Sequence, residues 1–224
     1  MKRTKLKDRE LPRYTKGEEI FNMVSHIVGA AFGIIAMVLC IIVASKHKNV
    51  YGIISSSIYG VSMITLYTIS SVYHGLSPKI TGKKVMQILD HCTIFVLIAG
   101  TYTPFALCSF REYNVAFGWG IFAIIWIVAA IGITLNAIDL KKYNIFSMIC
   151  YLGMGWIILL KANLLPILLG KDGVILLVLG GIAYTIGTIF YGLGVKHKYM
   201  HSIFHLFILL GSILHFFCIL LYVI

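Results

Sequence analysis

Two histidines, His201 and His205, stand four residues apart at the start of the last hydrophobic segment of this 224-residue chain. Residues four apart on a helix project from one face, about 6 Å from each other, so both imidazoles can bind one metal ion. Ionisable groups inside a membrane are costly, which makes them candidates for functional sites with a partner nearby. Two partners are available, namely His74 at the end of the second hydrophobic segment and Asp90 near the start of the third. Together these four side chains predict a metal site.

The ligand types favour zinc. Zinc binds imidazole nitrogen and carboxylate oxygen at about 2.0 to 2.2 Å, and three protein ligands with one open position are typical of catalytic sites. We expect His74, His201 and His205 to hold Zn²⁺. Asp90 is predicted either to bind the metal directly or to hold the metal-bound water as a base. Ser70, one turn before His74, is predicted to hydrogen-bond that water or to polarise a substrate carbonyl. A water on such an ion has a pKa of about 7 and is a nucleophile at neutral pH.

Simpler interpretations of the same residues exist. A lone histidine at a membrane boundary is commonly hydrogen-bonded or reaches toward water, so the metal site depends on the pair and its distant partners. Asp90 could instead form an ion pair with Lys83 or Lys84. Ser70 could bond back to a carbonyl of its own helix, as serines in membrane helices do.

The run that ends at His26 is also ambiguous. Glu19, Asn22 and His26 have spacings that put them on one helix face, close to the predicted site. A polar helix start, with acidic residues at the positive end of the helix dipole, explains them equally well. Both interpretations are open at this point.

Two further histidines are not expected to bind the metal. His91 follows Asp90 directly and points about 100° away from it on a helix, which favours a supporting or interfacial position. His215 lies ten residues beyond His205, roughly 15 Å along a helix. We therefore expect His215 to pack between helices.

The composition indicates whether these residues are surrounded by water or by lipid. With 59% hydrophobic and 12% charged residues, where soluble domains have about 25% charged, the chain is predicted to be an integral membrane protein. Pro104 is expected to kink its helix. Seven stretches have about the length of a bilayer span: 23–45, 50–74, 87–109, 114–137, 143–160, 173–194 and 201–223. We predict an all-α, seven-transmembrane helix bundle over residues 23–224, preceded by a basic cytoplasmic N-terminal segment, residues 1–22.

The distribution of positive charge predicts the orientation. With the N-terminus cytoplasmic and the C-terminus outside, fourteen of the 19 Lys and Arg face the cytoplasm, as the positive-inside rule requires. His74, Asp90 and the His201/His205 pair then lie at the same membrane face, although the charge count used none of them. The formal charge of +11 is explained by basic loops facing anionic lipid. Because the basic residues are scattered over many loops, we expect no nucleic-acid partner.

Motifs along almost the whole chain resemble the haemolysin III family, the bacterial branch of the progestin and adipoQ receptor (PAQR) family. The motifs are Glu18-Glu19-x-x-Asn22-x-x-Ser25-His26, Ser70-x-x-x-His74, Leu89-Asp90-His91, Ala99-Gly100-Thr101-Tyr102-Thr103-Pro104 and His201-x-x-x-His205. The resemblance implies a seven-helix protein of the bacterial inner (plasma) membrane, with zinc held by three histidines that match His74, His201 and His205, and with Asp90 and Ser70 beside it. It also implies kinship with alkaline ceramidases and hence hydrolysis of a lipid amide.

Three functions from different classes are compatible with these features. The first is a zinc-dependent hydrolase of a membrane lipid amide or ester that serves lipid homeostasis, with membrane lipids as substrate and partner. The second is a non-catalytic homeostasis or sensor protein in which zinc staples the second, third and seventh spans together. The third is a cytolysin, which needs a polar stripe through several spans, whereas the polar groups here gather in one leaflet. The open fourth position on the metal favours the hydrolase.

Overall fold

The computed structural model describes residues 3–224, which are helical and contain no strand. The long helices are α1 (Lys16–Lys46), α2 (Val50–Gly75), α3 (Thr81–Pro104), α5 (Val115–Trp156), α6 (Leu165–Leu193) and α7 (Met200–Tyr222). The short elements are η1 (Leu6–Asp8), η2 (Phe105–Phe110), α4 (Arg111–Tyr113) and η3 (Ile157–Lys161). Within the described residues, six helical segments are long and apolar enough to cross a membrane. The chain is therefore an all-helical, multi-pass membrane protein, as predicted.

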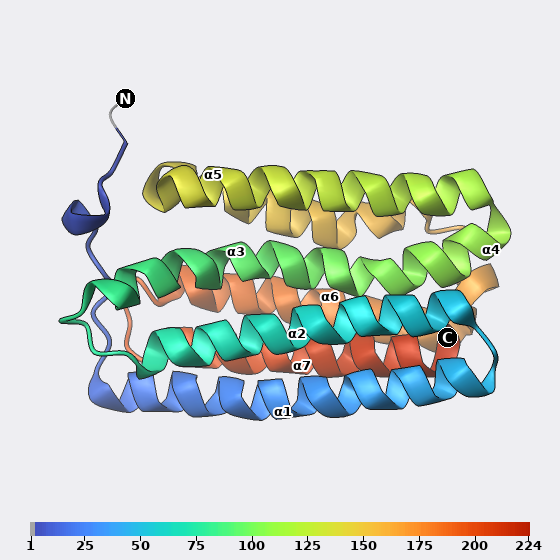
Figure 1. The fold of residues 1–224 in the computed structure, drawn as a ribbon, viewed down its shortest axis with the longest axis horizontal. Coiled ribbons are helices and arrows are strands. Elements are labelled where there is room, and N and C mark those ends of the chain that lie inside the picture. Colours follow the sequence, from blue (N-terminus) through green and yellow to red (C-terminus); the bar gives the residue numbers. More distant parts are fainter. Residues whose placement is uncertain (1–2) are drawn as a thin grey trace.

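Helix α5 is interrupted at Asp139. Its 42 residues would extend about 63 Å as a straight helix, twice the roughly 30 Å hydrocarbon core of a bilayer. Asp139 has non-helical torsion angles, φ −159° and ψ 93°, and its Oδ1 accepts a hydrogen bond of 3.2 Å from the Lys142 amide. Figure 1 shows α5 running along the bundle and then folding back beside itself. The break lies between the predicted spans 114–137 and 143–160.

The long helices surround a common interior (Figure 1). Helix α1 packs against α2 and α7, α2 also packs against α3, α3 packs against α5, and α6 packs against α7. Contact between α5 and α6 is sparse. Helices α1, α3 and α7 begin at one end of the bundle, and α2 finishes at the same end. We call it the N-terminal end of the bundle. Three segments far apart in the sequence meet there: the start of α1, the end of α2 and the start of α7.

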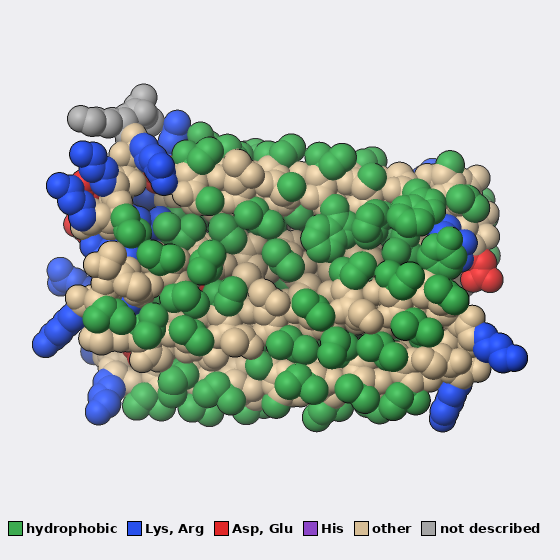
Figure 2. Space-filling view, viewed as in Figure 1, with side chains coloured by type: hydrophobic (Ala, Val, Ile, Leu, Met, Phe, Trp, Pro, Cys, Tyr) green, Lys and Arg blue, Asp and Glu red, His purple; other side chains and the backbone are tan. Residues whose placement is uncertain are grey.

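The sides of the bundle are apolar, and the charged side chains lie at its two ends (Figure 2). Large aliphatic side chains such as Ile35 and Ile127 are more than half exposed. Inside, the side chains of Tyr59, Tyr67 and Phe95 are completely buried. An apolar wall with buried tyrosine hydroxyls suits a protein surrounded by lipid, because each polar group must find its partner inside the protein.

The type of helix changes after Pro104. Helix α3 ends at Pro104, and Phe105–Phe110 follow in π-helical conformation before α4 begins. The sequence predicted a kink at Pro104, and the structure has a π-helical segment directly after this residue.

Gly60 allows α1 and α2 to approach closely, and we expect Gly60→Ala to destabilise the fold by about 1 to 3 kcal/mol. A Cβ at position 60 would lie 2.3 Å from Met37 Cβ, an atom bonded to the α1 backbone, so the helices would have to separate. The thermal unfolding midpoint in detergent micelles measures the effect. Gly120→Ala is the matched control, because a Cβ there meets nothing within 4 Å. Equal midpoints for the two variants would contradict this account of the α1–α2 contact.

Candidate metal centre

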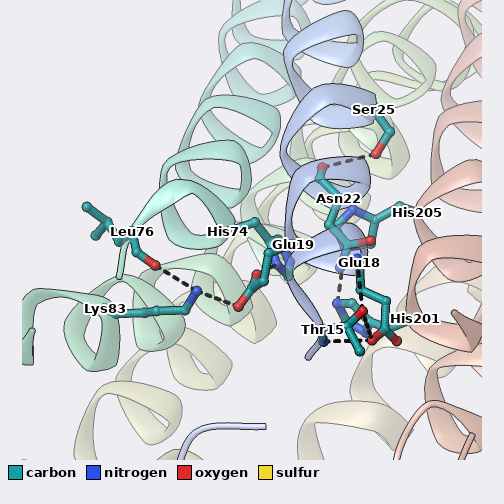
Figure 3. A network of polar contacts seen from close by, with 10 residues as sticks. All are labelled: Thr15, Glu18, Glu19, Asn22, Ser25, His74, Leu76, Lys83, His201 and His205. Atoms are coloured by element: carbon teal, nitrogen blue, oxygen red, sulfur yellow. Dashed lines mark hydrogen bonds and ion pairs between the residues drawn. The ribbon is translucent and has the colours of Figure 1, made fainter. Parts of the chain in front are cut away.

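Three histidines meet at the N-terminal end of the bundle (Figure 3). His74 lies in the last turn of α2, and His201 and His205 lie in the first two turns of α7. One ring nitrogen from each lies within 4.8 Å of the other two, and the Nε2 atoms of His201 and His205 are 3.1 Å apart. Their exposed fractions are only 2%, 7% and 1%. The structure thus brings together the three residues that the sequence predicted as metal ligands.

The donor atoms of this cluster fit a zinc ion. In tetrahedral coordination with bonds of about 2.0 to 2.1 Å, neighbouring nitrogens lie about 3.3 Å apart, close to the His201–His205 separation. Among the described residues, His74 Nε2 is buried and has no hydrogen-bond partner. A buried polar atom without a partner costs about 1 to 3 kcal/mol, and a bound cation removes this cost for a nitrogen that faces it.

Ser70 and Asp90 lie at the same end of the bundle as the cluster, near the end of α2 and the start of α3. Both line the same cavity as His205. Ser70 is buried, and the Asp90 side chain is 13% exposed. Asp90 is not among the residues whose ligand atoms lie within 4.8 Å of one another, and its Oδ2 lies 3.9 Å from His91 Nδ1. Asp90 therefore lines a cavity together with His205 but is not one of the grouped ligands.

The alternative partners considered for Asp90 bond elsewhere. Lys83 Nζ donates a hydrogen bond of 2.6 Å to Glu19 Oε1. Lys84 Nζ donates one of 2.8 Å to the carbonyl of Lys7. The interpretation of Asp90 as the ion-pair partner of either lysine is therefore wrong for this structure.

Glu19 contacts His74 directly. The Nδ1–H of His74 donates a hydrogen bond of 2.7 Å to Glu19 Oε2, while Lys83 bonds to the other oxygen (Figure 3). Lys83 also donates to the carbonyl of Leu76, at 2.9 Å. The sequence could place Glu19 on the correct face of its helix, but it left a simple polar helix start equally open. In the structure, Glu19 lies at the site, hydrogen-bonded to His74.

His26 lies against the cluster without belonging to it. Its ring stacks on that of His205, with centroids 3.8 Å apart and planes inclined by 15°. Because imidazole lone pairs lie in the ring plane, two parallel stacked rings cannot point at one ion. The nitrogens of His26 and the amide atoms of Asn22 are buried and have no partner within residues 3–224. Helix α1 thus contributes a polar wall to the site.

His91 and His215 occupy the kinds of position that the sequence predicted. His91 Nδ1–H donates to the carbonyl of Gln87 at 2.9 Å, and the Tyr191 hydroxyl donates to His91 Nε2 at 3.2 Å. His215 Nε2–H donates to the carbonyl of Leu177 in α6, at 3.1 Å. His215 therefore packs between α6 and α7, away from the cluster.

The segment before α1 crosses the N-terminal end of the bundle, and we call residues 4–15 the N-terminal strap. The amide of Thr4 donates to Asp139 Oδ2 at 2.8 Å, so the strap is attached where α5 reverses. Arg9 Nη2 donates to Gln87 Oε1 of α3, at 3.0 Å. The sequence predicted only a basic tail here. In the structure α1 begins at Lys16, not at residue 23, and the strap is folded against the bundle.

Tyr14 of the strap covers the cluster. Its ring stacks on His201 with a centroid distance of 4.9 Å and a plane angle of 27°, and it lies 5.7 Å from the His74 ring. Burial raises the pKa of the Tyr14 hydroxyl well above its usual range, so the phenol stays neutral at physiological pH. No feature of the sequence around Tyr14 predicted this contact.

A cavity inside the bundle is lined by one histidine of the cluster, His205. Ser70 and Asp90 line it as well, and most of its other lining residues, from α3, α5, α6 and α7, are apolar, such as Leu97 and Leu177. The volume open to the centre of a water molecule is about 150 Å³, several times the roughly 10 to 15 Å³ that one water needs. Mostly apolar walls with a few polar groups fit an amphipathic ligand.

Comparison with known proteins relates the whole region that contains the site to one family. The profile of the family described as "Haemolysin-III related" matches residues 14–216. Hemolysin-3 of Bacillus cereus is 42% identical over 207 residues, which cover 92% of either chain. The Hemolysin-3 homolog of Bacillus subtilis (strain 168) is 40% identical over 209 residues, 93% of this chain and 96% of the relative. The Monocyte to macrophage differentiation factor of Homo sapiens is 27% identical over 176 residues, 74% of this chain and 69% of the relative.

Proposed function

This chain belongs to the haemolysin-III related family, and we propose that it is a zinc-dependent hydrolase of a membrane lipid amide or ester that acts in membrane lipid homeostasis. The observation that carries the proposal is the single cavity shared by His205, Ser70 and Asp90, whose remaining walls are mostly apolar. A metal that only joined helices would need no such space next to a carboxylate and a hydroxyl.

The residues around the cavity have the chemistry that hydrolysis requires. A zinc ion held by His74, His201 and His205 would supply Lewis acidity, which polarises a carbonyl and lowers the pKa of water. Asp90 accepts the proton of the attacking water and returns it to the leaving nitrogen or oxygen. Ser70 donates a hydrogen bond to the substrate carbonyl. The apolar walls hold an acyl chain and exclude bulk water from the reacting groups.

The proposed topology has seven spans, with the N-terminal end of the bundle on the cytoplasmic side of the bacterial cell membrane. Two observations support it. Helix α5 has the length of two spans and reverses at Asp139. Twelve of the 19 Lys and Arg lie at this end, in the strap, at the starts of α1 and α3, beside the break in α5 or in the connections, and two more, Lys2 and Arg3, precede the strap in the sequence. The site then lies in the inner leaflet, where it meets lipid substrates of that leaflet.

The proposal is tested with the purified full-length protein in mild detergent. We expect nearly stoichiometric zinc, and release of free fatty acid from a ceramide or a phospholipid, measured by mass spectrometry. Removal of the metal with a chelator should abolish the release, and added zinc should restore it. Fatty-acid release that persists at the same rate without metal would rule out a zinc-dependent hydrolase.

A second candidate is a non-catalytic protein in which zinc staples α2 and α7. The observation that favours it is the position of Tyr14, whose ring covers His201 and encloses the cluster. The staple predicts bound zinc and raised thermal stability with no release of fatty acid. The same preparation therefore distinguishes the two functions.

A further inference from the structure

The Glu19 carboxylate lies between two buried donors from different helices. Its Oε2 accepts a hydrogen bond of 2.7 Å from His74 Nδ1, and its Oε1 accepts one of 2.6 Å from the Lys83 ammonium. The exposed fraction of Lys83 is 1%, and Nζ also donates to the Leu76 carbonyl and lies 5.1 Å from the centre of the Tyr73 ring. Each carboxylate oxygen thus has its own partner.

This arrangement determines which nitrogen of His74 carries the proton. A carboxylate can only accept, so the bond to Oε2 keeps the proton on Nδ1. The lone pair of Nε2 is then free, and Nε2 is a buried atom without a partner among the described residues. Imidazoles that bind metals commonly donate their other N–H to a carboxylate, and loss of that acceptor typically weakens metal binding 10- to 100-fold.

We propose that Glu19 and Lys83 are positioning residues that hold His74 as the Nδ1–H tautomer and thereby set the affinity of the site for its metal. The inference rests on the proposed zinc site. Lys83 fixes the second oxygen of Glu19, so the carboxylate cannot rotate away from His74. The pair joins α1, the end of α2 and the start of α3 in one network, which Figure 3 shows next to the cluster.

Glu19→Gln tests the arrangement because glutamine has the same shape but only one acceptor oxygen. If that oxygen serves Lys83, the amide –NH₂ group faces His74 Nδ1. That nitrogen must then accept, and its proton moves to Nε2, the atom that should bind the metal. We therefore expect E19Q to bind zinc about 10- to 100-fold more weakly, measured by competition with a chelator.

Glu18→Gln is the matched control on the neighbouring residue. Glu18 accepts hydrogen bonds from the Tyr199 amide at 2.7 Å and from Thr15, and no hydrogen bond joins it to His74. E18Q removes the same charge one position away, so we expect lower thermal stability but zinc affinity close to that of the unmodified protein. Equal affinities for E18Q and E19Q would overturn the proposal.

A second variant shows whether zinc affinity depends on the hydrogen bond to His74 or on the charge of Glu19. It also keeps the test valid if E19Q misfolds. In E19Q/K83M the lysine no longer competes for the glutamine oxygen, which can accept the His74 Nδ1–H again. The double variant also leaves no buried lysine without its carboxylate. We expect it to recover zinc affinity relative to E19Q, and failure to recover would contradict the assigned geometry.

The tautomer itself is measured on metal-free protein by ¹⁵N NMR of the histidine side chains. We expect the His74 proton on Nδ1 in the unmodified protein and in E19Q/K83M, and on Nε2 in E19Q. A proton that stays on Nδ1 in E19Q would overturn the proposal even if affinity falls, because the loss would then be due to charge alone. If the unmodified protein binds no zinc, the proposed hydrolase fails, while the NMR result still tests the geometry of this pair.

Discussion

Replacement of His205 with alanine is expected to lower zinc affinity on the order of 10²- to 10³-fold. Zinc-finger sites with four ligands have binding free energies of about 10 to 16 kcal/mol, or roughly 2.5 to 4 kcal/mol per ligand. His205 is almost completely buried, with its Nε2 3.1 Å from His201 Nε2, and alanine has no nitrogen that could bind the ion. Zinc content after dialysis and titration against a chelator measure the loss.

His215→Ala is the control for this variant. It removes a second buried histidine from the same helix, one that bonds to the Leu177 carbonyl. We expect a lower unfolding midpoint but full zinc content. If His205→Ala retained as much zinc as His215→Ala, the three-histidine cluster could not be the metal site.

Asp90→Asn is expected to slow lipid hydrolysis by about 10²- to 10⁴-fold, the usual contribution of a general acid or base. The amide has the size of the carboxylate but cannot accept the proton of the attacking water. Because Asp90 lies outside the group of three histidines, zinc content should not change. Fatty-acid release is compared with zinc content in the same preparation.

Asp172→Asn controls for the loss of a negative charge. Asp172 is exposed and lies near the start of α6, at the opposite end of the bundle from the cluster. We expect unchanged hydrolysis. An Asp90→Asn protein that loses zinc would make Asp90 a direct ligand, and one that keeps full activity would rule out the proposed proton transfer.

The helices could be predicted from the sequence because bilayer spans need long apolar runs that charges, glycine and proline interrupt. The break in α5 at Asp139 lies between two predicted spans for this reason. The ends were less predictable. Helix α1 begins at Lys16 because Thr15 and Glu18 form a capping box, a local signal that hydropathy ignores.

The proximity of the three histidines could be predicted because it depends only on the spacing of two of them and on the direction in which each span crosses the membrane. His201 and His205 share a helix face at a spacing of four, and the direction of each span decides which end of the bundle His74 occupies. Neither argument requires knowledge of how one helix is rotated about its axis relative to another. Both arguments could therefore be made from the sequence alone.

Glu19 and Tyr14 could not be placed in this way. The bond between Glu19 and His74 depends on how α1 is rotated and shifted against α2, which the apolar faces of the two helices do not specify. Tyr14 belongs to a segment rich in Lys and Arg, a composition that predicts exposure to solvent, and the anchor of that segment, Asp139, is 135 residues away from Thr4. Contacts between such distant positions leave no local pattern.

The N-terminal strap has a practical consequence for anyone who prepares this protein. The amide of Thr4 is hydrogen-bonded to Asp139, and the ring of Tyr14 stacks on His201. We therefore expect an affinity tag fused ahead of the strap to disturb the packing of the segment that covers the histidines. Helix α7 carries the chain from the cluster to the far end of the bundle, where the carboxyl terminus lies (Figure 1). A tag fused there leaves the strap undisturbed, and it is the better choice for metal analysis.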